Sequence, residues 1–169
     1  MMLNEIDTDA TNAIDIGCNR GAITRRAANN GLFSLGIDRK ATIVNSARRR
    51  TDSPHCHFIQ QNLEPKDIER LPDFDVCFIL AVYYHWTTLY GTSEAEKMLR
   101  DLCHQTNQVF LETPNDLTYI QSDELDQNKD PRNALYSYFN TVTPDSSVEF
   151  VGETEYKGGD RTDLIFVLS

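Results

Sequence analysis

The sequence predicts an α/β protein, in which a doubly wound, mostly parallel β-sheet lies between two layers of helices as a three-layer sandwich. Apolar runs typical of strands alternate with amphipathic stretches typical of helices as far as residue 112. The strongest run, 74–82, is almost continuously apolar, as expected for a strand that a parallel sheet buries on both faces. Two strand-like runs around a Gly-Gly turn end the chain and predict an antiparallel hairpin.

The alternating elements follow in a regular order, each with its own local signal. Apolar runs that end in a glycine, an acid or a turn predict the strands, and amphipathic spacing with a terminal glycine, proline or capping residue predicts the helices. The last of these helices opens with a Ser-x-x-Glu capping box at Ser93 and Glu96. The expected strands are 13–17, 32–38, 57–60, 74–82 and 108–112, and the expected helices are 21–30, 41–50, 65–71 and 93–104.

Outside the alternating part the chain changes character. Residues 1–11 form a polar tail. Residues 115–147 are polar with interspersed aromatic side chains, which predicts one or two irregular helices and an insertion or lid on the substrate side of a site. We expect a single domain over residues 1–169. The hairpin strands are expected at 148–156 and 162–168, joined by a turn at 157–160.

Composition narrows the function classes. The 40% hydrophobic fraction suffices for a buried core. Acidic residues outnumber basic ones by 26 to 16, a formal net charge of −10, which argues against a simple binder of phosphate backbones. There is no apolar stretch long enough for a membrane span, and the N-terminus lacks the basic start and apolar core of a signal peptide. We expect a cytoplasmic protein without membrane contact.

The charge is unevenly placed along the chain. Residues 1–50 carry 8 basic and 5 acidic residues, whereas residues 51–169 carry 8 basic and 21 acidic ones. The cationic first part invites a search for an anionic or electron-rich ligand. Of the 16 basic residues, 11 are arginine and only 5 are lysine. An acid-rich, lysine-poor surface suits a cytoplasm of very high salt, so a halophilic origin is a hypothesis.

Several conspicuous residues favour a structural interpretation. The cysteines are scattered singly, as expected for free thiols of a reducing compartment, most of them buried. His55 and His57 flank Cys56, but strand alternation sends the histidines to one face and the thiol to the other, so no metal site is predicted. The arginine run 48–50 is expected to be a solvated helix end. The cysteines are Cys18, Cys56, Cys77 and Cys103.

The segment Asp15-Ile16-Gly17-Cys18-Asn19-Arg20-Gly21 carries the chemistry. It stands where the first strand ends and a helix begins, so a glycine turn there lets the backbone approach a ligand closely. Asp38 ends the second strand about 20 residues later, where an acid can accept hydrogen bonds from both hydroxyls of a ribose. A glycine turn and an acid at this interval indicate a nucleoside cofactor.

The spacing within the turn distinguishes two kinds of cofactor. A dinucleotide site expects G-x-G-x-x-G, whereas this turn has Gly17-x-Asn19-x-Gly21. It resembles motif I of the class I S-adenosylmethionine-dependent methyltransferases, which is usually D/E-x-G-x-G-x-G. Asn19 stands in place of the middle glycine, and asparagine tolerates the left-handed backbone such a turn requires. The sequence pattern D-I-G-C-N-x-G also resembles that of some family members, including bicoid-interacting-type RNA methyltransferases.

The resemblance extends over residues 13–112 and implies a Rossmann-like fold and S-adenosylmethionine as cofactor, with S-adenosylhomocysteine as product. Asp38, followed by Arg39, corresponds to the acid that binds the cofactor ribose. Asn62 and Leu63 correspond to the loop that brackets the adenine. Glu112 resembles the acid at the end of the fifth strand. The cofactor-binding residues implied in this way are Asp15, Gly17, Cys18, Asn19, Gly21, Asp38, Arg39, Asn62, Leu63, Leu80 and Ala81.

The segment after the fourth strand, 80–86, resembles the stretch that lies beside the methionine moiety and the substrate. Because the sulfonium methyl is already activated, the protein mainly has to align the acceptor and exclude water. A positioned base can take the proton of a hydroxyl or amine acceptor. His85 is the candidate base, and Tyr83 and Tyr84 are candidates to stack on or orient the substrate. The alternative is that His85 only lines the pocket.

Three functions remain open at this point. The first is methyl transfer to an unidentified acceptor. The second is a catalytically silent, cofactor-binding subunit that supports a partner protein. The third is an NAD-type Rossmann oxidoreductase, against which Asn19, the Gly17–Gly21 spacing and the terminal hairpin count.

The sequence gives conflicting indications about the methyl acceptor and about partner proteins. The motif around Asn19 and the cationic first part fit RNA, whereas the acidity of the remainder favours a small molecule or a protein side chain. The sheet begins only about a dozen residues into the chain, so the N-terminal helix that covers the substrate in many members is expected to be absent or very short. We therefore expect an open site, or one completed by a partner chain or a second copy.

Overall fold

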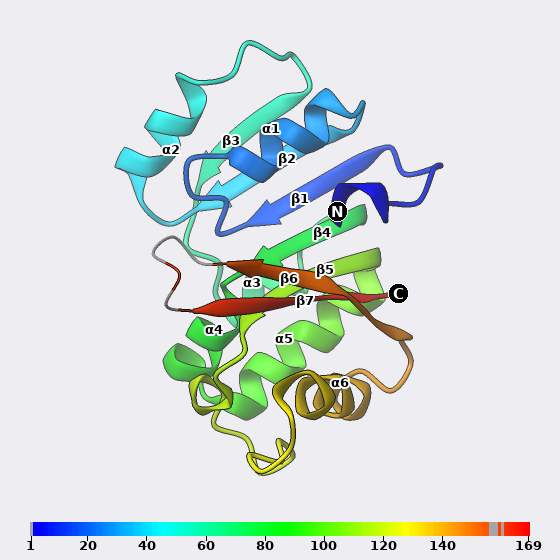
Figure 1. Cartoon of the computed structure of the whole chain (residues 1–169). Helices are drawn as coiled ribbons and strands as arrows, with labels where there is room; N and C mark the ends of the chain where they lie inside the picture. The colour runs from blue at the N-terminus through cyan, green and yellow to red at the C-terminus, as the bar shows by residue number, and fades with distance from the viewer. Residues whose placement is uncertain (1, 156–158, 160) are drawn as a thin grey trace.

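The computed structural model describes residues 2–155, 159 and 161–169. Its strands form one sheet in the order β3-β2-β1-β4-β5-β7-β6 (Figure 1). The first five strands along the chain are parallel, and β7 runs antiparallel between β5 and β6. The strands are β1 (Asn12–Ile16), β2 (Phe33–Asp38), β3 (Cys56–Gln60), β4 (Phe74–Leu80), β5 (Thr106–Pro114), β6 (Val148–Glu155) and β7 (Thr162–Leu168).

Helices cover both faces of the sheet, which confirms the predicted three-layer sandwich (Figure 1). On one face Ala27 packs with Val76 and Phe78, whereas on the other Met98 packs with Cys77. Apolar side chains that alternate along β4 thus divide the core into two layers. The helices are α1 (Ala22–Asn29), α2 (Ala41–Arg48), α3 (Pro65–Ile68), α4 (Tyr83–Tyr90), α5 (Thr92–Gln105) and α6 (Pro131–Val142), with 3-10 turns η1 (Met2–Asn4) and η2 (Leu117–Tyr119).

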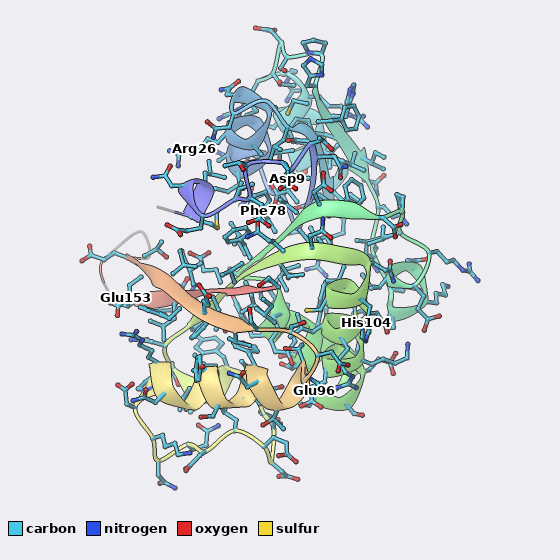
Figure 2. The ribbon with its side chains drawn as sticks, turned by 90° about the vertical axis from the view of Figure 1, so that its right-hand side faces the viewer. Asp9, Arg26, Phe78, Glu96, His104 and Glu153 are labelled. Atoms are coloured by element: carbon cyan, nitrogen blue, oxygen red, sulfur yellow. The ribbon has the colours of Figure 1, made fainter. Side chains whose placement is uncertain are left out.

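The structure corrects the prediction around residues 80–96. The segment after β4 forms α4, which the sequence did not predict because its aromatic and threonine residues are weak helix formers. The predicted capping box is wrong: Ser93 lies inside α5, whose N-cap is Gly91, with no side-chain cap bond. The Glu96 carboxylate instead accepts hydrogen bonds from the Tyr138 and Ser122 hydroxyls, at 3.0 and 3.2 Å. Figure 2 shows Glu96 beside α6.

The predictions for the cysteines and for the side-chain alternation along β3 agree with the structure. Cys18, Cys56 and Cys77 are buried free thiols and Cys103 is half-buried. Cys56 is buried while His57 is exposed, so the expected alternation along β3 is confirmed. Tyr156 and most of the expected turn at 157–160 lie outside the described residues. In the part of the chain that the structure describes, no helix is both long and apolar enough to cross a bilayer.

Candidate active site

The glycine turn after β1 lies at the edge of the sheet where the parallel strands end. Three of its residues have a left-handed backbone: Gly17 (φ 75°), Asn19 (φ 50°) and Gly21 (φ 71°). The Gly17 and Cys18 amides both donate to the Ile37 carbonyl, at 2.8 and 2.9 Å. The turn is thereby fixed to the end of β2, and asparagine serves at the middle position as the sequence predicted.

Asp38 closes the turn from the neighbouring strand. Its Oδ2 accepts a hydrogen bond from the Asn19 amide at 3.1 Å, and its Oδ1 accepts one from the Lys40 amide at 2.9 Å. Both oxygens keep further lone pairs, because a carboxylate offers about four acceptor sites. The two halves of the sequence motif, 19 residues apart, thus meet in one place.

Gly17 and Gly21 are required for different reasons. A Cβ on Gly17 would lie 2.5 Å from Cγ2 of Val82, which follows β4, so only glycine lets the turn approach that strand end. A Cβ on Gly21 would lie 2.4 Å from the Phe58 ring, so Gly21 serves the packing of α1 against β3. Both glycines therefore allow close packing within the protein, Gly17 at the exposed end of β1 and Gly21 in the buried layer beneath α1.

The end of β4 carries a strained residue that sequence reasoning had no means to detect. Ala81 has a φ of 56°, a left-handed conformation that alanine rarely adopts, and its amide donates to the Glu112 carbonyl at 3.0 Å. Such strain persists where surrounding contacts enforce it, and it gathers at functional sites. Here it redirects the chain from Leu80 into α4 and places Val82 against Gly17.

His85 lies in the first turn of α4 and is exposed. Its ring stands 4.2 Å from the Tyr84 ring, centroid to centroid. Partial burial lowers the pKa of His85, and the positive charges of Arg39 and Arg161 lower it further. The imidazole is therefore neutral at pH 7, the form in which it can accept a proton. Because Arg39 directly follows Asp38, His85 lies within electrostatic reach of the glycine-turn edge.

Comparison with known proteins places this arrangement in a family. A family model described as "Methyltransferase domain" matches residues 14–105, more than half of the chain. The chain belongs to the class I S-adenosylmethionine-dependent methyltransferases. No curated protein gave a significant match to the sequence.

Solved structures of other methyltransferases share this fold at low identity. A crystal structure of WbdD superposes with a TM-score of 0.75 and 21% identity over 95% of this chain, which spans only 35% of the WbdD chain. The N-terminal domain of EvdMO1 with S-adenosylhomocysteine bound gives 0.71 and 17%, covering 99% of this chain and 77% of that one. Magnesium protoporphyrin IX methyltransferase from Synechocystis PCC 6803, with bound S-adenosylmethionine, gives 0.66 and 17%, covering 99% and 73%.

Two residues of the methyltransferase motif turn out to support the turn from the core. The Asp15 carboxylate is buried and accepts from the Thr24 amide at 3.1 Å and the Thr24 hydroxyl at 2.6 Å, which fixes the first turn of α1. Burial outweighs these bonds and raises its pKa to about 6. The Cys18 thiol is buried beside Phe58, and burial raises its pKa. Both predicted cofactor-binding side chains are thus buried beneath the turn in this structure.

Tyr83 also departs from its expected role as a substrate-contacting residue. It is fully buried, and its hydroxyl lies 2.7 Å from the Tyr138 hydroxyl. Burial raises its pKa well above the usual tyrosine value. The helical period explains this placement, because α4 turns Tyr83 and Trp86 toward the core while His85 faces outward and Tyr84 is half-buried. Tyr83 is thus a structural residue.

The remaining candidates follow β3 and β5. Asn62 is exposed on the loop after β3, whereas Leu63 is buried and its carbonyl accepts from the Tyr90 hydroxyl at 3.2 Å. Glu112, near the end of β5, accepts a hydrogen bond from the Thr154 hydroxyl at 2.6 Å, and burial raises its pKa. The Glu112 side chain therefore links β5 to β6 of the terminal hairpin.

Sequence reasoning missed a group at the same edge. The Arg161 guanidinium pairs with Asp163 through two contacts, Nε–Oδ1 at 2.7 Å and Nη2–Oδ2 at 2.8 Å. It also lies over the Tyr119 ring, 5.9 Å from the centroid. Arg161 immediately precedes β7 and Asp163 is the second residue of that strand, so the alternation of side chains places the two on one side. The spacing of Arg161 and Asp163 could have predicted their ion pair from the sequence. The contact with Tyr119 could not be predicted in this way, because Tyr119 is distant in sequence.

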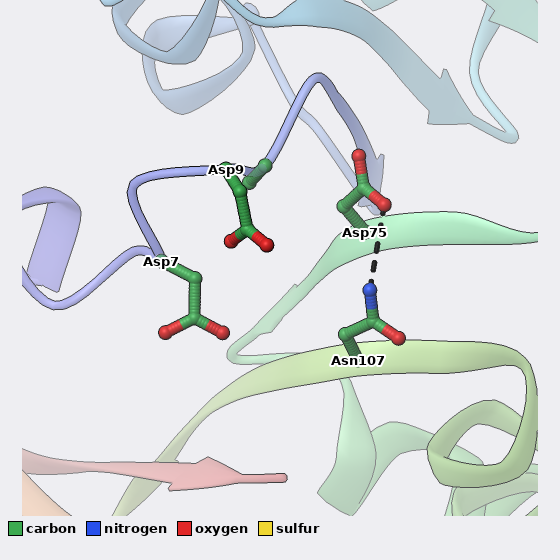
Figure 3. A pocket seen from close by; sticks show the side chains of 5 residues that line it. Asp7, Asp9, Asp75 and Asn107 are labelled. Atoms are coloured by element: carbon green, nitrogen blue, oxygen red, sulfur yellow. Dashed lines mark hydrogen bonds between the residues drawn. The ribbon is translucent and has the colours of Figure 1, made fainter.

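A small acidic pocket at the opposite edge of the sheet is not part of this site. Its volume is about 40 Å³, and Asp7, Asp9, Asp75 and Asn107 line it (Figure 3). The Asp75 carboxylate is already engaged, accepting from the Thr11 amide at 2.7 Å and the Asn107 side chain at 3.4 Å. These bonds hold together the amino-terminal ends of the strands.

Proposed function

We propose that this chain transfers the methyl group of S-adenosylmethionine to a hydroxyl or amine of an acceptor molecule. One observation supports this above all: the left-handed turn at Gly17 and Asn19 meets the Asp38 carboxylate and the strained end of β4 at one edge of the sheet. A methyl donor with a nucleoside, an amino acid and a sulfonium centre needs all three of these contacts.

The residues present fit such a cofactor. The backbone of the turn is exposed at Gly17 and Asn19, where a bound molecule can approach it closely. The Asp38 oxygens would accept hydrogen bonds from ribose hydroxyls, and Asn62 with Leu63 would flank the adenine. Leu80 and Ala81 would lie beside the methionine part. When bound, the cofactor supplies an electrophilic methyl group, and the chain aligns the acceptor with it and excludes water.

His85 has the properties of a general base for this reaction. It is exposed, neutral at pH 7 and within electrostatic reach of both Arg39 and Arg161. A neutral imidazole can take the proton of a hydroxyl as its oxygen attacks the methyl group. The proton then passes to solvent, which returns His85 to its starting state.

Calorimetric titration tests the cofactor assignment. We expect S-adenosylhomocysteine to bind and NAD to bind far more weakly; tighter NAD binding would overturn the assignment. Gly17→Val should abolish binding, because its side chain would collide with Val82. Gly31→Ala is the matched control: it also has a positive φ, of 97°, but a Cβ there meets nothing within 4 Å, so binding should persist.

Turnover separates the enzyme from a silent subunit. Release of S-adenosylhomocysteine with a panel of hydroxyl and amine acceptors, including RNA oligonucleotides, should identify an acceptor, and His85→Asn should then lower kcat more than it raises KM. Cofactor binding without turnover on any acceptor would instead support a cofactor-binding subunit that serves a partner.

A further inference from the structure

Beyond His85, the edge of the sheet continues into an aromatic cluster built from three segments. The Tyr84 ring of α4 stands 5.3 Å from the Tyr119 ring of η2, in an edge-on arrangement. The guanidinium of Arg161, which immediately precedes β7, lies over the Tyr119 ring and also faces the Tyr84 hydroxyl. Tyr119 is nevertheless 41% exposed. A large aromatic ring therefore stands open to solvent, separated from the candidate base by the ring of Tyr84.

A series of contacts links the candidate base to Tyr119. Arg39, beside Asp38, lies within electrostatic reach of His85, and His85 contacts Tyr84, which contacts Tyr119. A molecule that binds at His85 and extends along this series of contacts would thus meet the rings of Tyr84 and Tyr119.

Tyr119 is held in place from both directions along the chain. Before it, Asp116 accepts hydrogen bonds from the Thr118 amide at 3.0 Å and the Thr118 hydroxyl at 2.6 Å. After it, the Ser122 hydroxyl donates to Glu96 at 3.2 Å. On the far side the Arg161 guanidinium is fixed by Asp163, which is only 3% exposed. An exposed ring that is ordered beforehand loses little conformational freedom on binding.

We propose that Tyr84 and Tyr119 form the wall of the acceptor site, and that the acceptor is a planar aromatic molecule carrying a hydroxyl group. Planar rings pack favourably on tyrosine in offset or edge-on geometry, and the exposed surface of Tyr119 provides the place. This inference rests on the proposed methyl transfer. The acceptor oxygen forms a bond to the methyl carbon as the sulfur–methyl bond breaks, and the hydroxyl proton passes to His85. The products are an aryl methyl ether and S-adenosylhomocysteine.

A matched pair of probes tests the shape of the acceptor. The bicyclic alcohols 2-naphthol and decahydro-2-naphthol share a skeleton and a hydroxyl group, but only the first is planar. Their affinities for the full chain saturated with S-adenosylhomocysteine can be measured by amide NMR titration, which also reports whether each variant is folded. We expect 2-naphthol to bind at least about tenfold more tightly than its saturated counterpart.

Variants of Tyr119 locate the effect. Tyr119→Ala should weaken 2-naphthol binding about tenfold and remove the discrimination, whereas Tyr119→Phe should retain both. Tyr136→Ala is the control, since Tyr136 is a tyrosine of similar exposure, 46%, on α6. Failure of 2-naphthol to bind, equal affinity for both alcohols, or unchanged binding in Tyr119→Ala would overturn the inference. Loss of S-adenosylhomocysteine binding to the unmodified chain would instead contradict the proposed function itself.

Discussion

At the scale of single residues, Asp15 shows how a motif residue can hold the glycine turn and α1 together from the core. Its carboxylate is buried and holds Thr24 through two hydrogen bonds. Because burial raises its pKa to about 6 from a usual value of 3.8, the folded protein binds this proton more tightly than the unfolded chain does. The stability that comes from the bound proton is complete below about pH 4 and is lost as the pH rises through about 6.

This linkage gives a measurable pH dependence. We expect the free energy of unfolding of the unmodified protein to fall between pH 4 and pH 7, relative to that of Asp15→Asn, by about 3 kcal/mol. Urea unfolding of both proteins across this range would show the difference as a change of slope. Parallel pH profiles would mean that Asp15 titrates in the folded state as it does in the unfolded chain.

His85 provides a second residue-level prediction, independent of any acceptor. Burial, Arg39 and Arg161 all lower its pKa below 6.5. Arg39→Gln removes one of the two cations and should raise the pKa of His85, which NMR titration of the imidazole Cε1 proton would reveal. Arg49→Gln, which removes a cation at the end of α2, should leave it unchanged. An unaltered His85 pKa in Arg39→Gln would show that Arg39 lies outside its electrostatic reach.

At the scale of elements, Glu96 joins α5 to the segment after β5. Its carboxylate accepts hydrogen bonds from the hydroxyl of Ser122 and from that of Tyr138 on α6, and Tyr138 in turn contacts Tyr83 at the start of α4. One carboxylate therefore ties together the helix that carries the candidate base and the segment that carries Tyr119.

Removal of this carboxylate should loosen both elements. We expect Glu96→Ala to lower the free energy of unfolding by about 2 kcal/mol, because the Tyr138 hydroxyl loses a partner in a buried position. Hydrogen exchange of the amides in segment 115–130 should also accelerate. Glu94→Ala on the same helix should change stability by less than about 0.5 kcal/mol. Equal effects of the two substitutions would contradict a specific role for Glu96.

At the scale of the whole molecule, the net charge of −10 predicts that salt stabilises the fold. Molar KCl should raise the melting temperature measured by calorimetry, because it screens repulsion among the acidic residues. Replacing the exposed Glu149 and Glu153 of β6 by lysine should reduce this salt dependence. A protein that unfolds in molar KCl would rule out the halophilic hypothesis.

The sequence by itself determined the features that depend on neighbouring residues. Apolar runs, period and turn residues predicted the strands and most of the helices, and the position of Asn19 in the glycine motif predicted its left-handed backbone. The meeting of the glycine turn with Asp38 followed as well, because adjacent parallel strands end at one edge.

Only the tertiary structure decided which way several side chains face. Asp15 and Tyr83 turned inward because Thr24 and Tyr138 offered buried hydrogen bonds, and Ala81 adopted a positive φ because β5 and Gly17 constrain the end of β4. Glu96 joined a network instead of capping its helix, and Tyr119 met Arg161 across 42 residues of chain. These outcomes depend on contacts between segments distant in sequence, whose free energies exceed the local preferences that a motif or a period records.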